Sequence, residues 1–200
     1  AIAQSEGFIV AWPNGLCSSW NAGPRCCAPA SNNEIDDIGF VRKMIEQLVE
    51  IHNIDGSRIY LTGLSNGCAM AQRIANEASD LITATACMSL HLLTEIDADY
   101  TAVPVMTIMG TNDDLYLANE EMPGAVENFE RWRQMNNCQG AYEVTWSSGE
   151  SVTWTYKDCD NQTEVALVTI DDGGHMLYQS EQTNINTTQL ALDFMKKFKK

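Results

Sequence analysis

Uninterrupted apolar runs alternate with segments of helical periodicity along this chain of 200 residues. The runs are short, and Gly, Pro, Asn or Ser residues bound them, which is the pattern of buried strands. The runs YEVTW and SVTWTY are separated only by Ser147-Ser148-Gly149-Glu150, so we expect them to form a hairpin. Seven strands are predicted, over residues 7–12, 58–63, 81–90, 103–110, 142–146, 151–156 and 164–170.

Four helices are predicted between these strands. Apolar residues recur at helical spacing from Ile35 to Ile51, with Ser31 to Asn33 available as the N-cap. Pro123 fits the first position of a helix over 123–136. The other two helices cover residues 66–78 and about 184–199. Strands with unbroken apolar runs that alternate with helices indicate one α/β domain over residues 1–200, whose sheet is largely parallel and covered on both faces.

Composition and charge exclude several classes of partner. No apolar stretch approaches the roughly 18 residues of a membrane span. The net charge of −15 repels phosphate backbones, so we expect no nucleic-acid partner. The first residues lack the basic and apolar regions of a signal peptide, so any such peptide lies outside this sequence.

Seven cysteines favour disulfides in an exported protein, either secreted or periplasmic. An odd number leaves at least one free thiol, and Cys87, inside an apolar run, is our choice. Cys26 and Cys27 are adjacent, so each is expected to pair with a distant partner, with Cys17 and Cys68 as the candidates.

The segment Gly63-Leu64-Ser65-Asn66-Gly67 joins a predicted strand to a predicted helix. That context is typical of a nucleophile elbow, a tight turn that exposes a serine hydroxyl beyond the end of a strand. We therefore predict Ser65 as a nucleophile and the Asn66 N–H as an oxyanion donor.

A nucleophilic serine needs a histidine base and a carboxylate that orients the base. Of the three histidines, His52 ends a helix, and His91, which could line the site, precedes any later acid. His175 follows the strand 164–170 in a glycine-rich loop, as the chain order Ser…Asp…His requires. The acid is Asp113 or Asp114, directly after the strand 103–110.

The chain resembles the polyhydroxybutyrate-depolymerase and feruloyl-esterase branch of the α/β-hydrolases from residue 7 to about residue 177. The segments that carry the resemblance are GFIVAWPNG, SWNAGPRCC, NNEIDDIGFVRKMI, DGSRIYLTGLSNGCAMA, VPVMTIMGTNDD and VTIDDGGH. It implies Ser65 as nucleophile and His175 as base, and it favours Asp113 over Asp114. It also implies a Cys138–Cys159 disulfide, and it makes Trp20 and Asn21 candidates for substrate contact.

The chain differs from this family at three places. The family's earlier strand with a His-Gly motif, whose loop provides a second oxyanion N–H, is not in this sequence, so we expect an α/β-hydrolase core reduced at its N-terminus. In a minimal core, strand 7–12 would pack beside strand 58–63, and Gly15 or Leu16 would donate the second N–H. The tryptophan that often follows the family's histidine is replaced by Met176-Leu177. No insertion long enough for a lid is evident, which favours short acyl esters or exposed polymer chains over long lipids.

The leading hypothesis is a monomeric serine carboxylic-ester hydrolase that acts through an acyl-enzyme without metal or cofactor. Its substrate would be a small-molecule or polymeric ester, and acyl transfer to an alcohol is a possible second reaction. One alternative is a non-catalytic binding module derived from a hydrolase. Another is a metal-dependent hydrolase with an oxygen-rich site formed by Asp113, Asp114, Asp171, Asp172 and His175.

Overall fold

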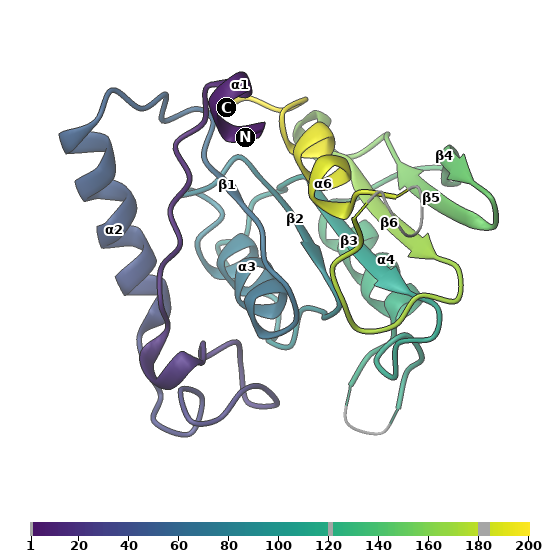
Figure 1. Cartoon of the computed structure of the whole chain (residues 1–200), viewed down its shortest axis with the longest axis horizontal. Coiled ribbons are helices and arrows are strands. Elements are labelled where there is room, and N and C mark those ends of the chain that lie inside the picture. The colour runs from purple at the N-terminus through teal and green to yellow at the C-terminus, as the bar shows by residue number, and fades with distance from the viewer. Residues whose placement is uncertain (1, 120–121, 180–184) are drawn as a thin grey trace.

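The computed structural model describes residues 2–119, 122–179 and 185–200. Within these ranges a six-stranded sheet has the order β1-β2-β3-β6-β5-β4 (Figure 1). Strands β1, β2, β3 and β6 are parallel, and β5 and β4 continue the sheet as an antiparallel hairpin. The predicted mostly parallel sheet and the hairpin are thus confirmed. The strands are β1 (Tyr60–Leu61), β2 (Ala84–Met88), β3 (Val105–Gly110), β4 (Glu143–Ser148), β5 (Ser151–Tyr156) and β6 (Val165–Ile170).

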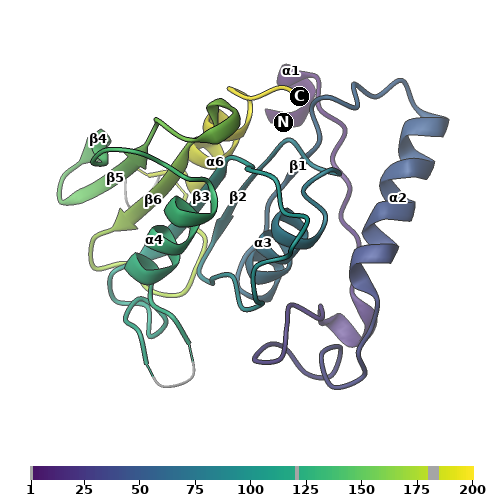
Figure 2. The ribbon, with the colours of Figure 1, turned by 180° about the vertical axis from the view of Figure 1, so that it is seen from behind.

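Helices cover both faces of the sheet, as predicted. Helices α3 (Asn66–Glu77) and α4 (Ala125–Met135) lie on one face, and α6 (Thr187–Met195) lies on the other (Figures 1 and 2). Helix α2 (Asp37–Ile51) stands beyond the β1 edge, and α1 (Ile2–Glu6) lies near the C-terminus. Two short 3₁₀ turns, η1 (Leu16–Ser18) and η2 (Asp160–Gln162), complete the regular elements of the described chain.

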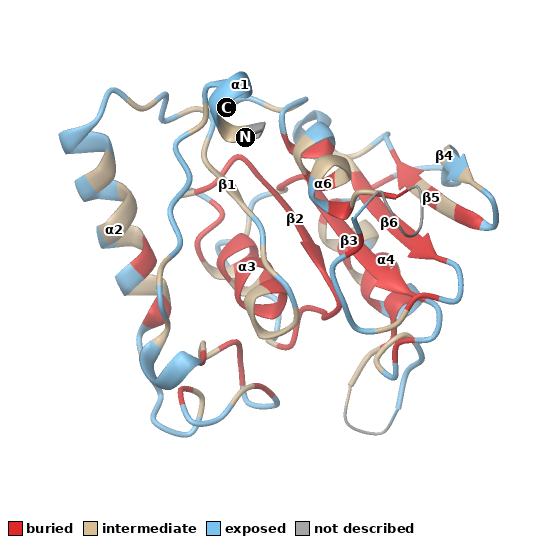
Figure 3. Cartoon of the chain, in the orientation of Figure 1, coloured by how far each residue is buried: buried red, intermediate tan, exposed pale blue. Residues whose placement is uncertain are grey.

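The central strands are buried throughout because each contributes to two cores. Side chains of successive strand residues point to opposite faces of a sheet. In β2, Cys87 joins the core under α3 and α4, whereas Ala86 and Met88 join the core under α6. All residues of β2, β3 and β6 are therefore buried (Figure 3).

The predicted strand over residues 7–12 is wrong. The segment runs past the β1 edge (Figure 1), but β1 pairs only with β2 among the described residues. Ile9, Val10 and Trp12 are exposed. An apolar run forms a strand only where a neighbour accepts and donates its backbone hydrogen bonds, and this segment has no such neighbour.

Two helices begin later than their sequence signals indicated. Asp36, not Ser31 to Asn33, caps α2, because its carboxylate accepts the Gly39 N–H at 2.8 Å. Gly124 is the N-cap of α4, so Pro123 lies before the helix instead of at its first position. Of the predicted helix 184–199, residue 184 lies outside the described residues, and α6 begins after its N-cap Asn186.

Three disulfides are present in the described chain, which fits a protein that folds in an oxidising compartment. The Cys138–Cys159 pair is confirmed. The prediction that Cys87 is free is wrong, because Cys87 faces α3 and pairs with Cys68 there. Cys26 and Cys27 pair with each other instead of with distant partners, and the exposed Cys17 is the free cysteine.

The described helices include none that is long and apolar enough to cross a membrane. The absence of a lid stays a prediction, because residues 120–121, between β3 and α4 in the sequence, and residues 180–184, between β6 and α6, lie outside the described residues.

Candidate active site

Ser65 lies in a strained turn between β1 and α3. Its backbone angles are φ 54° and ψ −121°, a combination that non-glycine residues rarely adopt and that costs about 1–3 kcal/mol. The Ser65 N–H donates to the Met88 carbonyl at 2.8 Å, and the Met88 N–H donates to the Gly63 carbonyl at 2.9 Å. These bonds to the end of β2 hold the serine in the conformation that a nucleophile elbow requires.

Of the two glycines of the elbow, only Gly63 occupies a position where a larger residue would not fit. A Cβ on Gly63 would collide with the backbone of Gly67, whereas a Cβ on Gly67 would meet nothing within 4 Å. Gly63 therefore permits the close approach of β1 to α3, and Gly67 provides the backbone that lies against it.

This difference predicts opposite outcomes for two alanine substitutions. Gly63→Ala forces the turn open and should lower the free energy of unfolding by about 1–3 kcal/mol, as overpacking does. Gly67→Ala lies at the start of α3 and should be neutral or stabilising, since alanine has the higher helix propensity. Urea denaturation of both variants measures the difference. Equal stability of the two variants would contradict the steric role of Gly63.

The loops after β3 and β6 bring an acid and a histidine together. Asp113 Oδ2 accepts a hydrogen bond from His175 Nδ1 at 2.9 Å, and Asp113 Oδ1 accepts the Leu115 N–H at 3.0 Å. The Asp113 side chain is 1% exposed and that of His175 is 40% exposed, whereas Asp114 is exposed. Of the two candidate acids, Asp113 is the one that contacts the histidine.

Backbone contacts fix the two loops against each other. The Asn112 N–H donates to the Gly173 carbonyl at 2.8 Å, and a Cβ on Gly110 would collide with the backbone of Gly173. The Tyr178 hydroxyl donates to the Gly174 carbonyl, directly before His175. Burial, aided by the nearby Asp113, raises the pKa of Tyr178, so its hydroxyl stays protonated as this bond needs. The sequence reasoning missed this contact, although Tyr178 lies three residues after His175.

Ser65, Asp113 and His175 all lie after strands that end at the same edge of the sheet (Figure 1). The structure joins Asp113 to His175, but within the described residues no hydrogen bond joins Ser65 Oγ to His175 Nε2. Such bonds are often long in an enzyme without substrate and tighten when substrate binds.

The Asn66 N–H has no acceptor in the described part of the chain, so it is available to an anion. The Asn66 side chain is engaged elsewhere: its Oδ1 accepts the Trp20 N–H at 2.7 Å, and its Nδ2 donates to the Trp20 carbonyl at 2.9 Å. These two hydrogen bonds attach the loop before α2 to the start of α3. The indole of Trp20 stacks on Phe40, with ring centroids 6.2 Å apart.

Gly15, Leu16 and Asn21, which are also predicted for the site, make most of their contacts within their own loop. Gly15 packs against Ser19 and the Trp20 ring, its carbonyl accepts the Ser18 N–H at 3.1 Å, and the Leu16 carbonyl accepts the Ser19 N–H at 3.2 Å. The Asn21 side chain donates to the Ile35 carbonyl at 3.0 Å, which commits its amide nitrogen to the loop itself. The oxyanion roles of Gly15 and Leu16, and the substrate contacts of Trp20 and Asn21, stay predictions.

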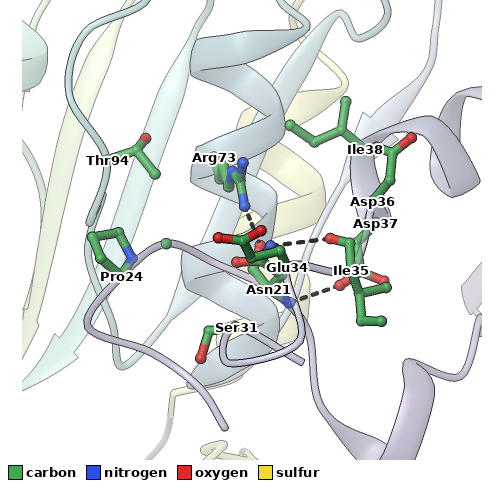
Figure 4. A pocket seen from close by; sticks show the side chains of 11 residues that line it. Asn21, Pro24, Ser31, Glu34, Ile35, Asp36, Asp37, Ile38, Arg73 and Thr94 are labelled. Carbon is green, nitrogen blue, oxygen red and sulfur yellow. Dashed lines mark hydrogen bonds between the residues drawn. The ribbon is translucent and has the colours of Figure 1, made fainter. Parts of the chain in front are cut away.

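A polar cavity of about 470 Å³ lies beside this loop but does not contain Ser65, Asp113 or His175 (Figure 4). Its lining includes Asp37, which accepts the Asn21 N–H at 2.7 Å, and Arg73, which donates to the Asn21 carbonyl at 2.7 Å. Arg73 also forms an ion pair with Glu77. The cavity lacks a nucleophile beside a base, so we place the candidate chemistry at the Asp113–His175 pair instead.

The two remaining histidines are not bases of this site. His52 is the C-cap of α2, the helix that stands beyond the β1 edge of the sheet, and no hydrogen bond in the described chain joins its side chain to Ser65 or Asp113. His91 does not line the site, because it is completely buried. Among the described residues, no group of three or more His, Cys, Asp or Glu side chains is arranged to hold a metal ion, so the five residues of the metal-dependent alternative are not gathered into such a group.

No protein-family model matches the chain, but the sequences of individual proteins do. The chain is 30% identical to "Feruloyl esterase B" of Piromyces equi over 193 residues, which cover 86% of this chain and 34% of that protein. It is 26% identical to "Probable feruloyl esterase C" of Aspergillus niger over 173 residues, which cover 86% of this chain and 58% of that protein.

A third relative, "Bifunctional acetylxylan esterase/xylanase XynS20E" of Neocallimastix patriciarum, is 25% identical over 87% of this chain and 25% of its own length. The chain thus spans less than two thirds of the length of each of these relatives, and about a third or less of two of them. Among solved structures, acetyl xylan esterase from Aspergillus awamori matches with a TM-score of 0.57 at 12% identity, over 80% of this chain and 66% of that one. Over most of its length the chain is therefore similar to feruloyl and acetylxylan esterases, and its mostly parallel sheet with helices on both faces is an α/β-hydrolase-like fold, as in the acetyl xylan esterase.

Proposed function

We propose that this chain is a serine carboxylic-ester hydrolase that acts through an acyl-enzyme. The observation that carries the proposal is the 2.9 Å hydrogen bond between the buried Asp113 carboxylate and His175, at the sheet edge where Ser65 occupies a strained elbow. The curated relatives named above are esterases, which supports the same reaction class.

The Asp113–His175 bond determines which histidine nitrogen acts. A carboxylate only accepts, so His175 Nδ1 carries a hydrogen and Nε2 has the free lone pair. In the proposed first step Nε2 takes the Ser65 proton while Oγ bonds to the ester carbonyl carbon. The Asn66 N–H stabilises the negative oxygen that forms. The C–O bond to the alcohol then breaks, and Nε2 gives its proton to the departing oxygen.

Water completes the cycle in the same geometry. Nε2 removes a proton from water, the hydroxide oxygen bonds to the acyl carbon, and the bond to Ser65 Oγ breaks as the serine regains its proton. An alcohol in place of water would give a new ester, which is the proposed transesterification. The names of the relatives favour feruloyl esters and acetyl esters of xylan, and we extend the substrate class to short acyl esters and exposed polyester chains.

Two assays test the reaction class. The chain should hydrolyse p-nitrophenyl acetate and butyrate, and a fluorophosphonate should label Ser65, located by mass spectrometry of its peptide. EDTA should leave the rate unchanged. Labelling without turnover, or no labelling, would favour a binding module, and inhibition by EDTA would favour metal-dependent hydrolysis. A preference for long acyl chains in the p-nitrophenyl series would contradict an open, lidless site.

The second oxyanion donor has its own test at Leu16. In the described chain the Leu16 N–H has no acceptor, and Gly15 before it has an extended ψ of 153°, which a following proline favours. Leu16→Pro therefore removes the N–H with little change elsewhere and should lower kcat roughly a hundredfold. Leu16→Ala keeps the N–H and removes a side chain that is 55% exposed, so it should stay near the original rate. Equal rates for the two variants would rule out Leu16 as a donor.

A further inference from the structure

His91 follows β2 in a buried segment that contacts the acid loop. The whole residue is 0% exposed, and its Nε2 lies 2.9 Å from the Leu115 carbonyl oxygen. Because a carbonyl oxygen only accepts, Nε2 carries the hydrogen and His91 is the donor. A buried histidine thus holds the backbone two residues after Asp113.

The contact continues through the acid to the base. The Leu115 N–H donates to Asp113 Oδ1 at 3.0 Å, and Asp113 Oδ2 accepts from His175 Nδ1 at 2.9 Å. Displacing Leu115 would therefore move the group that orients one carboxylate oxygen, and with it the oxygen that holds His175. Beyond Leu115, Tyr116 packs partly against the core and its carbonyl accepts the Ala125 N–H at 2.9 Å, whereas Leu117 is 73% exposed. The His91 contact is thus the restraint at the Leu115 carbonyl itself, the one closest along the backbone to Asp113.

The segment that carries His91 is fixed from both sides by buried amides. Gln72 Nε2 of α3 donates to the Leu90 carbonyl at 3.0 Å, and the Leu92 N–H donates to Asn128 Oδ1 of α4 at 3.0 Å. Trp132 Nε1 in turn donates to Gln72 Oε1 at 2.7 Å. A side chain on such a restrained segment can set the position of the group that it contacts.

Its environment keeps His91 neutral. Its Nδ1 is buried without a hydrogen-bond partner in the described part of the chain, so a second N–H there would have no acceptor. Burial lowers the pKa of His91, although its bond to Leu115 and the carboxylates of Asp113 and Glu127 act in the opposite direction. Neutral His91 with its hydrogen on Nε2 is the form that the Leu115 contact needs.

We propose that His91 is a positioning residue that holds the Asp113 loop, through the Leu115 carbonyl, in the geometry that orients His175. The inference rests on the proposed function for its catalytic consequence. Its structural part, the placement of Asp113 against His175, does not depend on the reaction.

The test compares variants that keep or remove the donor. His91→Phe fills the space without a donor and should lower kcat for p-nitrophenyl acetate about tenfold or more, with KM nearly unchanged, because misplacement of a catalytic group acts on the chemical step. His91→Gln places an amide N–H near the Nε2 position and should recover most of that loss. If His91→Phe does not fold, His91→Asn replaces it, since its shorter amide cannot reach Leu115.

A proton NMR spectrum provides a readout that is independent of turnover. The His175 Nδ1–H bound to a carboxylate should give a downfield resonance, which Asp113→Asn removes and thereby assigns. The resonance should weaken or disappear in His91→Phe and return in His91→Gln. An unchanged resonance and an unchanged kcat in a folded His91→Phe or His91→Asn variant would overturn the proposal. Absence of hydrolysis by the unaltered chain would contradict only the proposed function, and the NMR comparison would still decide the positioning role.

Discussion

Ser65→Ala should lower kcat for p-nitrophenyl acetate by about a thousandfold or more, since removing the nucleophile of a serine hydrolase leaves only the contribution of the oxyanion hole and binding. Alanine keeps the Cβ that Ser65 already accommodates at φ 54°, so the elbow should retain its backbone conformation. The loss should therefore come from the missing hydroxyl.

The control is Ser147→Ala, the same chemical change at an exposed position of β4, on the opposite edge of the sheet from β1. It should leave kcat unchanged. Fluorophosphonate labelling should be lost in Ser65→Ala and kept in Ser147→Ala. Substantial residual turnover by folded Ser65→Ala would contradict the acyl-enzyme mechanism.

Asp113→Asn should lower kcat by about three to four orders of magnitude, the size seen when a triad histidine is held in the wrong tautomer. The hydrogen bonds of Asp113 explain why. One oxygen accepts the Leu115 N–H, so the asparagine carbonyl should take that place and turn its NH₂ group toward His175 Nδ1. The histidine hydrogen then moves to Nε2, where it prevents the base from accepting the Ser65 proton.

Asp114→Asn is the matched control, because it neutralises the adjacent, exposed carboxylate without touching His175. Its kcat should stay within about threefold of the original, as expected of a surface change away from the reacting groups. If Asp114→Asn caused the larger loss, the assignment of the acid to Asp113 would be wrong.

Much of the fold is predictable from local patterns. The strands β2, β3 and β6 are runs of apolar residues and threonine without charged side chains because both of their faces are buried, and the hairpin β4–β5 follows from two β-rich segments with a short turn. The elbow around Ser65 and the helix α3 are likewise continuous in the sequence.

The errors concern features that depend on a distant partner. Residues 7–12 have the composition of a strand, but β1 offers them no pairing. Cys87 has the surroundings of a buried free thiol, but Cys68 on α3 faces it across 19 residues of chain. The composition of a segment shows which secondary structure it can adopt. Whether it pairs with another strand or another cysteine depends on which residues the fold places beside it.

The same distinction applies to the candidate site. Local sequence patterns predict a serine in an elbow, an acidic pair after one strand and a histidine after another, since each lies within a few residues of its strand. The family resemblance already favours Asp113 over Asp114, and the folded chain supplies the physical reason, because burial and the bond to His175, 62 residues away, distinguish two adjacent carboxylates. Only the tertiary structure placed His91 against Leu115 and engaged Gln72 with Trp132, 60 residues apart. Hydrogen bonds between buried groups depend on distances of a few tenths of an ångström, and close packing of the completed sheet and helices sets those distances.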